Sequence, residues 1–301
     1  MKVLCLHGRG TSGAIFKSQT SSIRSKLTNL NPSLTFDFLN GQYPCSPAPG
    51  IDLFYPPPYY SYYEESTLES VLNPTTLASL EKAHTWLASI IAERGPYDIV
   101  LAFSQGCALA ASILLLHEQH FTNHQEATKT PASESPFKSA VFICGGPPFP
   151  FLESIGYTIS PHTKARDLAS RSAVTTMADS SAILSRGSAR WTSPGLDFGS
   201  SSPSSTTTSS QSILPSSFTF NKESEVRREM VGDLRIRIPT VHIYGERDPR
   251  YIAGIQLSEV CVRGKRKVYN HGGGHEIPRF EAVSAAMADL VRWAVWAAGE
   301  V

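Results

Sequence analysis

Residues 99–110, which read Ile-Val-Leu-Ala-Phe-Ser-Gln-Gly-Cys-Ala-Leu-Ala, constrain the fold of this chain more than any other segment. An apolar run leads into Ser104, and an alanine- and leucine-rich stretch with helical spacing follows it. This pattern is typical of a sharp strand-to-helix turn that lifts a serine hydroxyl clear of a sheet. The small residues Ala102 and Gly106 suit such a turn, because it brings two backbones close together. The usual pattern is G-x-S-x-G, so alanine at position 102 is a departure from it.

Short apolar runs alternate with helical patterns along most of the chain. Strands are expected at residues 2–6, 34–39, 97–103, 140–144, 239–245 and 267–270. Helices are expected from residue 12 onward and at residues 74–94, 105–117 and 279–298, and the polar residues 120–136 are expected to form a surface loop. This alternation predicts an α/β fold with a mostly parallel, doubly wound sheet and helices on both faces. Residues 1–301 are expected to form a single domain.

Two segments depart from this alternation. Residues 41–66 are rich in proline and tyrosine and cannot form a regular helix or a central strand, because proline removes a backbone donor and fixes φ. They are expected to line an acyl pocket, with Tyr59, Tyr60 and Tyr62 as candidate substrate-binding residues, or to form part of a cap; an irregular surface loop is the alternative. Residues 185–217 are rich in serine and threonine, have little to bury and are expected to form a flexible surface insertion.

Composition excludes several classes of protein. The net charge is +1, and the only basic cluster, residues 263–267, is expected to lie in a solvated loop or to cap a helix, which argues against nucleic-acid binding. No apolar run approaches the length that spans a membrane, and the N-terminal run is too short for a signal peptide.

The number of cysteines is odd, and their spacing is not of the zinc-binding type. We therefore expect neither a disulfide framework nor a metal site. The cysteines are Cys5, Cys45, Cys107, Cys144 and Cys261. A cytoplasmic protein is expected.

A serine hydroxyl becomes a good nucleophile only when a base removes its proton and an acid orients that base. Asp248, in residues 244–249, and His275, in residues 272–278, each follow the end of an expected strand. Catalytic groups of open α/β sheets gather outside the carboxyl ends of the strands. The order Ser, Asp, His along the chain is also the order found with this type of turn. Ser104, His275 and Asp248 are therefore the candidate nucleophile, base and acid.

Each candidate also has an alternative interpretation. Asp248 is well placed to cap a helix that begins near Pro249, and Glu246 is the nearest substitute acid. His271 is a weaker rival base. Ser104 and His275 could each be a structural turn residue.

When such a serine attacks a carbonyl carbon, the tetrahedral intermediate also needs two backbone donors for its oxyanion. The amide of Gln105, directly after the serine, is one candidate, and the amide of Arg9, after the first strand, is the other. His7 is expected to organise that first turn. The alternative for residues 7–10 is a phosphate-binding glycine loop, but the segment lacks both the G-x-G-x-x-G spacing and a P-loop lysine.

Three blocks of sequence resemble the FSH-type family of serine hydrolases, a branch of the α/β-hydrolase superfamily that is well populated in fungi. They are residues 3–8 (Val-Leu-Cys-Leu-His-Gly), 102–106 (Ala-Phe-Ser-Gln-Gly) and 272–278 (Gly-Gly-Gly-His-Glu-Ile-Pro), and residues 44–51 and 58–63 are also similar. The resemblance implies an α/β-hydrolase fold with a loop or cap region. It implies esterase or thioesterase activity without a cofactor, with Ser104 as nucleophile, Asp248 as acid and His275 as base. It further implies release or trimming of polyketide-type acyl chains in secondary metabolism.

The expected function is therefore hydrolysis of an acyl ester or thioester through an acyl-enzyme. The expected partner is a small-molecule substrate, either free or bound to a carrier protein. Acyl transfer to an alcohol or amine is an alternative that uses the same residues. A non-catalytic binding module that keeps the fold as a ligand pocket is the alternative from another class. The sequence names neither the acyl substrate nor the oligomeric state.

Overall fold

The computed structural model describes residues 1–28, 33–64, 74–127, 134–177, 226 and 229–299. Its core is a sheet of six parallel strands in the order β10 (Arg266–Asn270), β9 (Thr240–Tyr244), β6 (Ser139–Ile143), β5 (Ile99–Phe103), β1 (Lys2–Leu6) and β2 (Thr35–Leu39). Two short antiparallel pairs lie apart from it: β3 (Tyr43–Pro44) with β4 (Tyr60–Ser61), and β7 (Thr158–Ile159) with β8 (Met230–Val231). The expected insertion at 185–217 lies outside the described residues.

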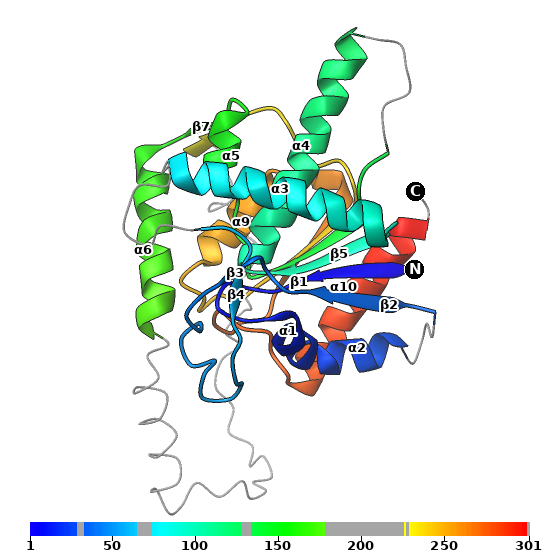
Figure 1. Ribbon diagram of the computed structural model, residues 1–301, viewed down its shortest axis with the longest axis vertical. Helices are drawn as coiled ribbons and strands as arrows, with labels where there is room; N and C mark the ends of the chain where they lie inside the picture. The colour runs from blue at the N-terminus through cyan, green and yellow to red at the C-terminus, as the bar shows by residue number, and fades with distance from the viewer. Residues whose placement is uncertain (29–32, 65–73, 128–133, 178–225, 227–228, 300–301) are drawn as a thin grey trace, which may run out of the picture.

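Helices cover both faces of the sheet (Figure 1). On one face lie α1 (Gly13–Gln19), α2 (Ser21–Thr28) and α10 (Glu281–Gly299). On the other lie α3 (Pro74–Arg94), α4 (Gln105–Ala127) and α9 (Tyr251–Glu259). A short 3-10 helix, η1 (Arg263–Lys265), leads into β10. The prediction of a doubly wound parallel sheet is confirmed.

Along the inner strands of the sheet, successive side chains point to opposite faces, and this alternation explains the two layers of helices. In β1, Leu4 and Leu6 pack with α3 and α4, while Val3 and Cys5 pack with α1, α2 and α10. All four side chains are fully buried. β5 and β6 divide their apolar side chains between the two layers in the same way. Because successive residues of a strand point to opposite faces, a continuous apolar run fills both layers at once.

The expected surface loop at residues 120–136 is corrected by the structure. Helix α4 continues through the first part of it to Ala127, and its end extends beyond the sheet in Figure 1. A helix that extends beyond the core no longer needs an apolar face. The helical spacing of apolar residues is therefore lost although the helix continues. Residues 128–133 lie outside the described part of the chain.

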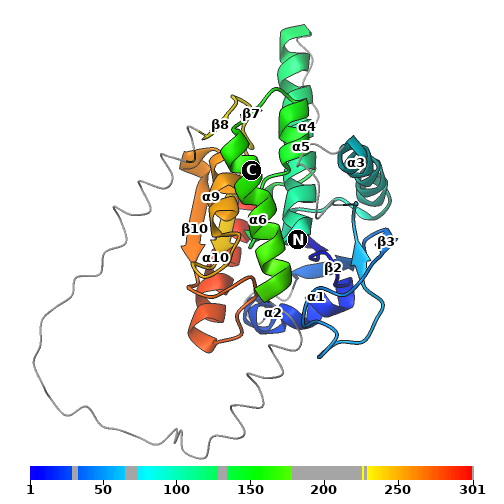
Figure 2. The ribbon, with the colours of Figure 1, turned by 90° about the vertical axis from the view of Figure 1, so that its left-hand side faces the viewer.

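Two further helices, which the sequence patterns did not predict, follow β6. They are α5 (Phe149–Ser154) and α6 (Pro161–Met177). Figures 1 and 2 show α6 lying across the edge of the sheet at which the parallel strands end. That edge is where an α/β sheet gathers its functional groups, so α6 forms a cap over it.

Candidate active site

Ser104 occupies the sharp turn between β5 and α4. Its φ of 50° lies in the left-handed region, which a residue other than glycine seldom adopts. The turn is held by two hydrogen bonds: the Ser104 amide donates to the Ile143 carbonyl at 3.0 Å, and the Cys107 amide donates to the Ser104 carbonyl at 3.0 Å. A Cβ at Gly106 would lie 2.5 Å from the carbonyl oxygen of Leu6, so β1 leaves no room for a larger residue. Strain of this kind at a single residue is common at functional sites.

The structure brings Ser104, His275 and Asp248 into one hydrogen-bonded chain. Nδ1 of His275 lies 2.8 Å from Oδ2 of Asp248, and Nε2 lies 2.9 Å from Oγ of Ser104. The ionised carboxylate can only accept, so Nδ1 carries the proton and Nε2 is left as an acceptor for the serine hydroxyl. The histidine is therefore in the tautomer that a general base needs.

Asp248 uses its two carboxylate oxygens for different purposes. Oδ2 faces His275, while Oδ1 accepts a hydrogen bond from the Arg250 amide at 2.8 Å, just before α9 begins. Burial by itself would favour the protonated acid, but the hydrogen bonds and charges of His275 and Arg250 hold the pKa of Asp248 below its usual value. The side chain is 1% exposed. The alternative interpretation of Asp248 as a helix cap is not what the structure shows: the N-cap position of α9 is Arg250, and the Asp248 carboxylate accepts from its amide in the turn before the helix.

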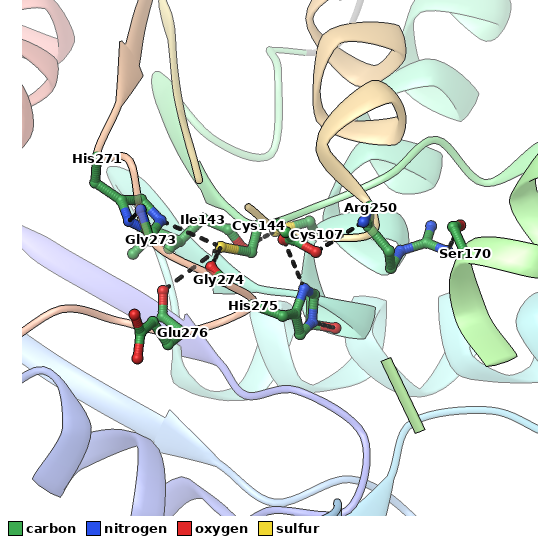
Figure 3. Close-up of polar contacts among 12 residues, drawn as sticks. Cys107, Ile143, Cys144, Ser170, Arg250, His271, Gly273, Gly274, His275 and Glu276 are labelled. Carbon is green, nitrogen blue, oxygen red and sulfur yellow. Dashed lines mark hydrogen bonds and ion pairs between the residues drawn. The ribbon is translucent and has the colours of Figure 1, made fainter. Parts of the chain in front are cut away.

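The rival candidates lie elsewhere. Glu246 is exposed to solvent, and the carboxylate that contacts His275 belongs to Asp248. His271 accepts a hydrogen bond from the Gly273 amide at Nδ1, so its Nε2 carries the proton and faces Sγ of Cys144 at 3.7 Å (Figure 3). Burial lowers the pKa of His271. This ring supports the loop that carries His275 rather than facing Ser104.

Cys144, Asp248 and His275 each offer one ligand atom within 4.8 Å of the others. A metal there would require the thiolate, yet burial raises the pKa of Cys144 well above its usual value. Asp248 and His275 are already hydrogen-bonded to each other. The chemistry of this donor set therefore favours the hydrogen-bonded chain over a metal site.

The first turn of the chain runs beside Ser104. A Cβ built on Gly8 would lie 3.3 Å from Cβ of Ser104, and Arg9 and Gln105 both border the same cavity as the serine. His7 is buried at this turn, where Nδ1 donates to the Gly8 carbonyl at 2.7 Å and Nε2 accepts from the Gly41 amide at 3.0 Å. His7 thus ties β1 to the proline- and tyrosine-rich segment.

The Gln105 side chain makes contacts that the sequence gave no reason to expect. Its Nε2 donates to the hydroxyl of Ser61 at 2.9 Å and to the carbonyl of Tyr63 at 3.0 Å. Its Oε1 accepts from the amide of Tyr62 at 3.0 Å. Gln105 therefore holds residues 61–63, at the end of β4 and just after it, against the start of α4.

A cavity of about 910 Å³ opens beside Ser104 and His275. It is bordered by the turn after β1, by residues 48–51, 54 and 55, by Arg171, Val174 and Thr175 of α6, and by the loops after β9 and β10. Residues of α6 carry no recognisable motif, so no sequence signal marks them as part of a site.

The three tyrosines expected to contact substrate are not among the residues that border this cavity. Tyr62 is fully buried, and its hydroxyl accepts a hydrogen bond from the His7 amide at 2.8 Å. Tyr59 is 9% exposed and donates to the Tyr55 carbonyl, while Tyr60 lies in the short strand β4. From the same segment, Phe54 and Tyr55 are among the residues that border the cavity.

Comparison with known proteins gives a consistent set of relatives. The profile of the family described as Serine hydrolase (FSH1) matches residues 1–159 and 197–287. Esterase FPY3 of Fusarium mangiferae is 28% identical over 280 residues, which are 93% of this chain and 89% of that protein. Esterase alnB of Emericella nidulans is 28% identical over 311 residues, which cover 98% of this chain and 96% of that protein. Among solved structures, a carboxylesterase from Mesorhizobium loti is 12% identical with a TM-score of 0.48, covering 97% of this chain and 88% of that chain.

Proposed function

Because this chain belongs to the serine hydrolase (FSH1) family, we propose that it cleaves carboxylic esters or thioesters with Ser104 as the nucleophile, His275 as the general base and Asp248 as the orienting acid. The enzyme is an esterase by its family and by the names of its relatives, and it has the α/β-hydrolase fold. The observation that carries the assignment of residues is the unbroken chain of hydrogen bonds at 2.8 and 2.9 Å that ends on a serine hydroxyl in a strained turn.

In the proposed mechanism, Oγ of Ser104 attacks the carbonyl carbon of the substrate while Nε2 of His275 takes the hydroxyl proton. Asp248 then faces the imidazolium and stabilises its charge. Collapse of the tetrahedral intermediate breaks the bond to the leaving alcohol or thiol, which receives the proton from His275. Water repeats the sequence on the acyl-enzyme: His275 takes one of its protons, the acid is released, and the proton returns to Ser104.

The oxyanion of both tetrahedral intermediates is held in this proposal by the amides of Arg9 and Gln105. The position of the first turn beside Ser104 supports Arg9, and the position of Gln105 at the start of α4 supports the second donor. Each preorganised donor of this type contributes roughly 10²–10³-fold to kcat. A general base contributes roughly 10²–10⁴-fold.

A thioester substrate with a polyketide-type acyl chain is a narrower proposal. The similarity to fungal esterases supports the ester chemistry but does not name an acyl group. Comparison of oxygen and sulfur esters of one acyl group tests it. A higher kcat/KM for the sulfur ester would support thioester cleavage, and a higher value for the oxygen ester would contradict it.

Replacement of Ser104 by alanine tests the proposed nucleophile. We expect Ser104→Ala to remain folded, to lose turnover of p-nitrophenyl butyrate by at least about 10³-fold, and to lose labelling by a fluorophosphonate probe. Ser89→Ala is a matched control, because Ser89 is exposed on α3 and its hydroxyl contacts only its own helix. Labelled and active Ser104→Ala protein would overturn the assignment.

A further inference from the structure

The cavity beside Ser104 is bordered by an unusual set of charged side chains. The arginines among the described residues that border it are Arg9, Arg171, Arg247, Arg250 and Arg279, and the carboxylate among them is that of Glu276. The chain as a whole is nearly neutral, with a net charge of +1. The arginines come from the turn after β1, from α6, and from the loops after β9 and β10, so the fold gathers positive charge at this one place.

Two of these arginines share one acid. Nη2 of Arg250 lies 3.0 Å from Oδ1 of Asp167, and Nε of Arg171 lies 2.7 Å from Oδ2. Asp167 is 1% exposed, and although burial opposes its ionisation, the two guanidinium groups hold its pKa below the usual value. Both guanidinium groups border the cavity, and their shared contact with Asp167 fixes them in place there.

The other arginines contact neutral oxygens rather than acids. Nε of Arg247 donates to the carbonyl of Gly272 at 2.9 Å, and Nη2 of Arg279 donates to the hydroxyl of Tyr55 at 2.7 Å. Both side chains border the cavity, and neither forms an ion pair with another residue in the part of the chain that the structure describes. Arg9 is exposed and forms no ion pair within the residues that the structure describes.

Hydrolysis of a neutral ester needs none of this charge, since the proposed mechanism uses only the serine, histidine, aspartate and two amides. A cleft lined by one sign of charge concentrates ligands of the opposite sign, and guanidinium groups match the planar geometry of carboxylate and phosphate oxygens. We propose that the ester or thioester substrate carries a carboxylate or phosphate group, which these arginines hold while its carbonyl faces Ser104. This inference rests on the proposed function and names the substrate class for it.

The first arm of the test compares two substrates with the same acyl chain that differ in charge and by one methyl group. They are mono-p-nitrophenyl glutarate, which carries a carboxylate, and its methyl ester, which is neutral. We expect kcat/KM of the wild-type enzyme to be at least about tenfold higher for the anionic ester at low salt, since a charge-assisted hydrogen bond is worth at least that factor. The ratio of the two kcat/KM values should fall as salt rises, because exposed charges are screened.

The second arm places the anion on the leaving group instead. It compares butyryl-coenzyme A, which carries phosphates, with the neutral S-butyryl-N-acetylcysteamine. A preference for the anionic member in the first arm alone assigns the arginines to a carboxylate of the acyl group, and a preference in the second alone assigns them to phosphates of the thiol. Either result supports the proposal.

Variants identify the groups responsible. Arg247→Gln with Arg279→Gln, and separately Arg171→Gln, should each reduce the anionic-to-neutral ratio several-fold. Arg171→Gln removes one positive charge from the cavity border and leaves Asp167 paired with Arg250, so the buried acid keeps an ion pair. Arg247→Lys with Arg279→Lys should restore most of the preference. Arg292→Gln, on the exposed surface of α10, is the matched control and should leave the ratio unchanged.

The outcomes separate the two proposals. Equal kcat/KM values within both substrate pairs, or a preference that survives all the glutamine variants, would overturn the anionic substrate while leaving the esterase mechanism intact. Loss of turnover of every ester together with no labelling of Ser104 would instead overturn the proposed function.

Discussion

Asp248 shows how one side chain can complete two local structures. Its Oδ1 accepts from the backbone before α9, and its Oδ2 orients His275. Both contacts depend on the same short turn after β9, so the hydrogen bond from the Arg250 amide helps to fix the carboxylate beside the histidine. That hydrogen bond needs only an oxygen acceptor, whereas stabilisation of an imidazolium needs the negative charge.

Asp248→Asn separates these roles. Asparagine can still accept the hydrogen bond from the Arg250 amide, but it removes the charge and permits the wrong histidine tautomer, so we expect kcat for p-nitrophenyl butyrate to fall by about 10⁴-fold. The measurement is steady-state kinetics together with a thermal unfolding curve to show that the protein is folded. Glu246→Gln, which neutralises the exposed neighbour, should change kcat less than about twofold. An Asp248→Asn enzyme within tenfold of wild-type activity would remove Asp248 from the mechanism.

The turn between β5 and α4 depends on close contact with β1. Gly106 faces the carbonyl oxygens of Leu6 and His7, which would lie 2.5 and 2.9 Å from a Cβ at this position. Ala102, where glycine is more usual in this pattern, is fully buried at the end of β5 and is accommodated. The two positions that flank Ser104 therefore differ. Ala102 faces a layer of side chains, whereas Gly106 faces the backbone of β1 and the turn after it.

Gly106→Ala tests that difference. We expect a loss of about 1–3 kcal/mol in the free energy of unfolding, because β1 is paired on both sides, with β2 and β5, and must shift, and we expect kcat to fall as Ser104 moves. Urea unfolding and ester kinetics measure the two effects. Gly264→Ala is the matched control, since a Cβ there would meet nothing within 4 Å. Equal stability of the two alanine variants would show that the turn is not limited by this contact.

The spacing of apolar residues predicted most accurately the bounds of those helices and strands that have a complete apolar face. Helix α3 begins and ends as predicted, at residues 74 and 94, and the central strands lie within about two residues of their expected ends. Helices α5 and α6 and the outer part of α4 were missed. Helix α5 packs in the core, but its six residues are too few to show a helical period. Helix α6 and the outer part of α4 lie away from the core, where polar residues suit a solvated helix as well as they suit a loop.

Three histidines are buried in different layers of the fold. His7 bonds the first turn to Gly41, His84 on α3 bonds to Ser112 on α4 at 2.6 Å, and His242 in β9 bonds to Thr240 at 3.1 Å. Burial lowers the pKa of His7 and His84 to about 4 and that of His242 to about 3. The neutral form of each is thus built into the packing.

These histidines make the folded state sensitive to mild acid. Above about pH 6.5 they are neutral in both the folded and the unfolded chain. Between pH 6.5 and about 4 the unfolded chain takes up protons that the folded chain does not. As the pH is lowered through this range, the free energy of unfolding should therefore decrease by up to about 1.4 kcal/mol per pH unit for each histidine. Urea unfolding at pH 7.5, 6.0 and 5.0 measures this slope.

His84→Gln should reduce that slope by roughly a quarter to a third, because it removes one of the histidines with a lowered pKa, which are these three and His271. His120→Gln is the control, since His120 is exposed on α4. Unfolding free energies that do not change between pH 7.5 and 5.0 would contradict the neutral burial of these side chains.

None of the helices in the described residues is long and apolar enough to cross a membrane. Separately, part of the border of the cavity beside Ser104 is formed by α6 and by residues 48–51, 54 and 55.

The sequence by itself determined the alternation of strands and helices, the strained turn at Ser104, and the order in which Asp248 and His275 follow it. These features are local: each is written in the spacing of apolar, small and turn-forming residues over a few positions. The tertiary structure alone decided which groups meet. It set Nε2 of His275 at 2.9 Å from a serine 171 residues away, gave Asp248 both of its roles, and gathered arginines from positions 9 to 279 around one cavity. The paths of loops and the placement of α6 depend on packing between distant segments, for which spacing along the chain carries no signal.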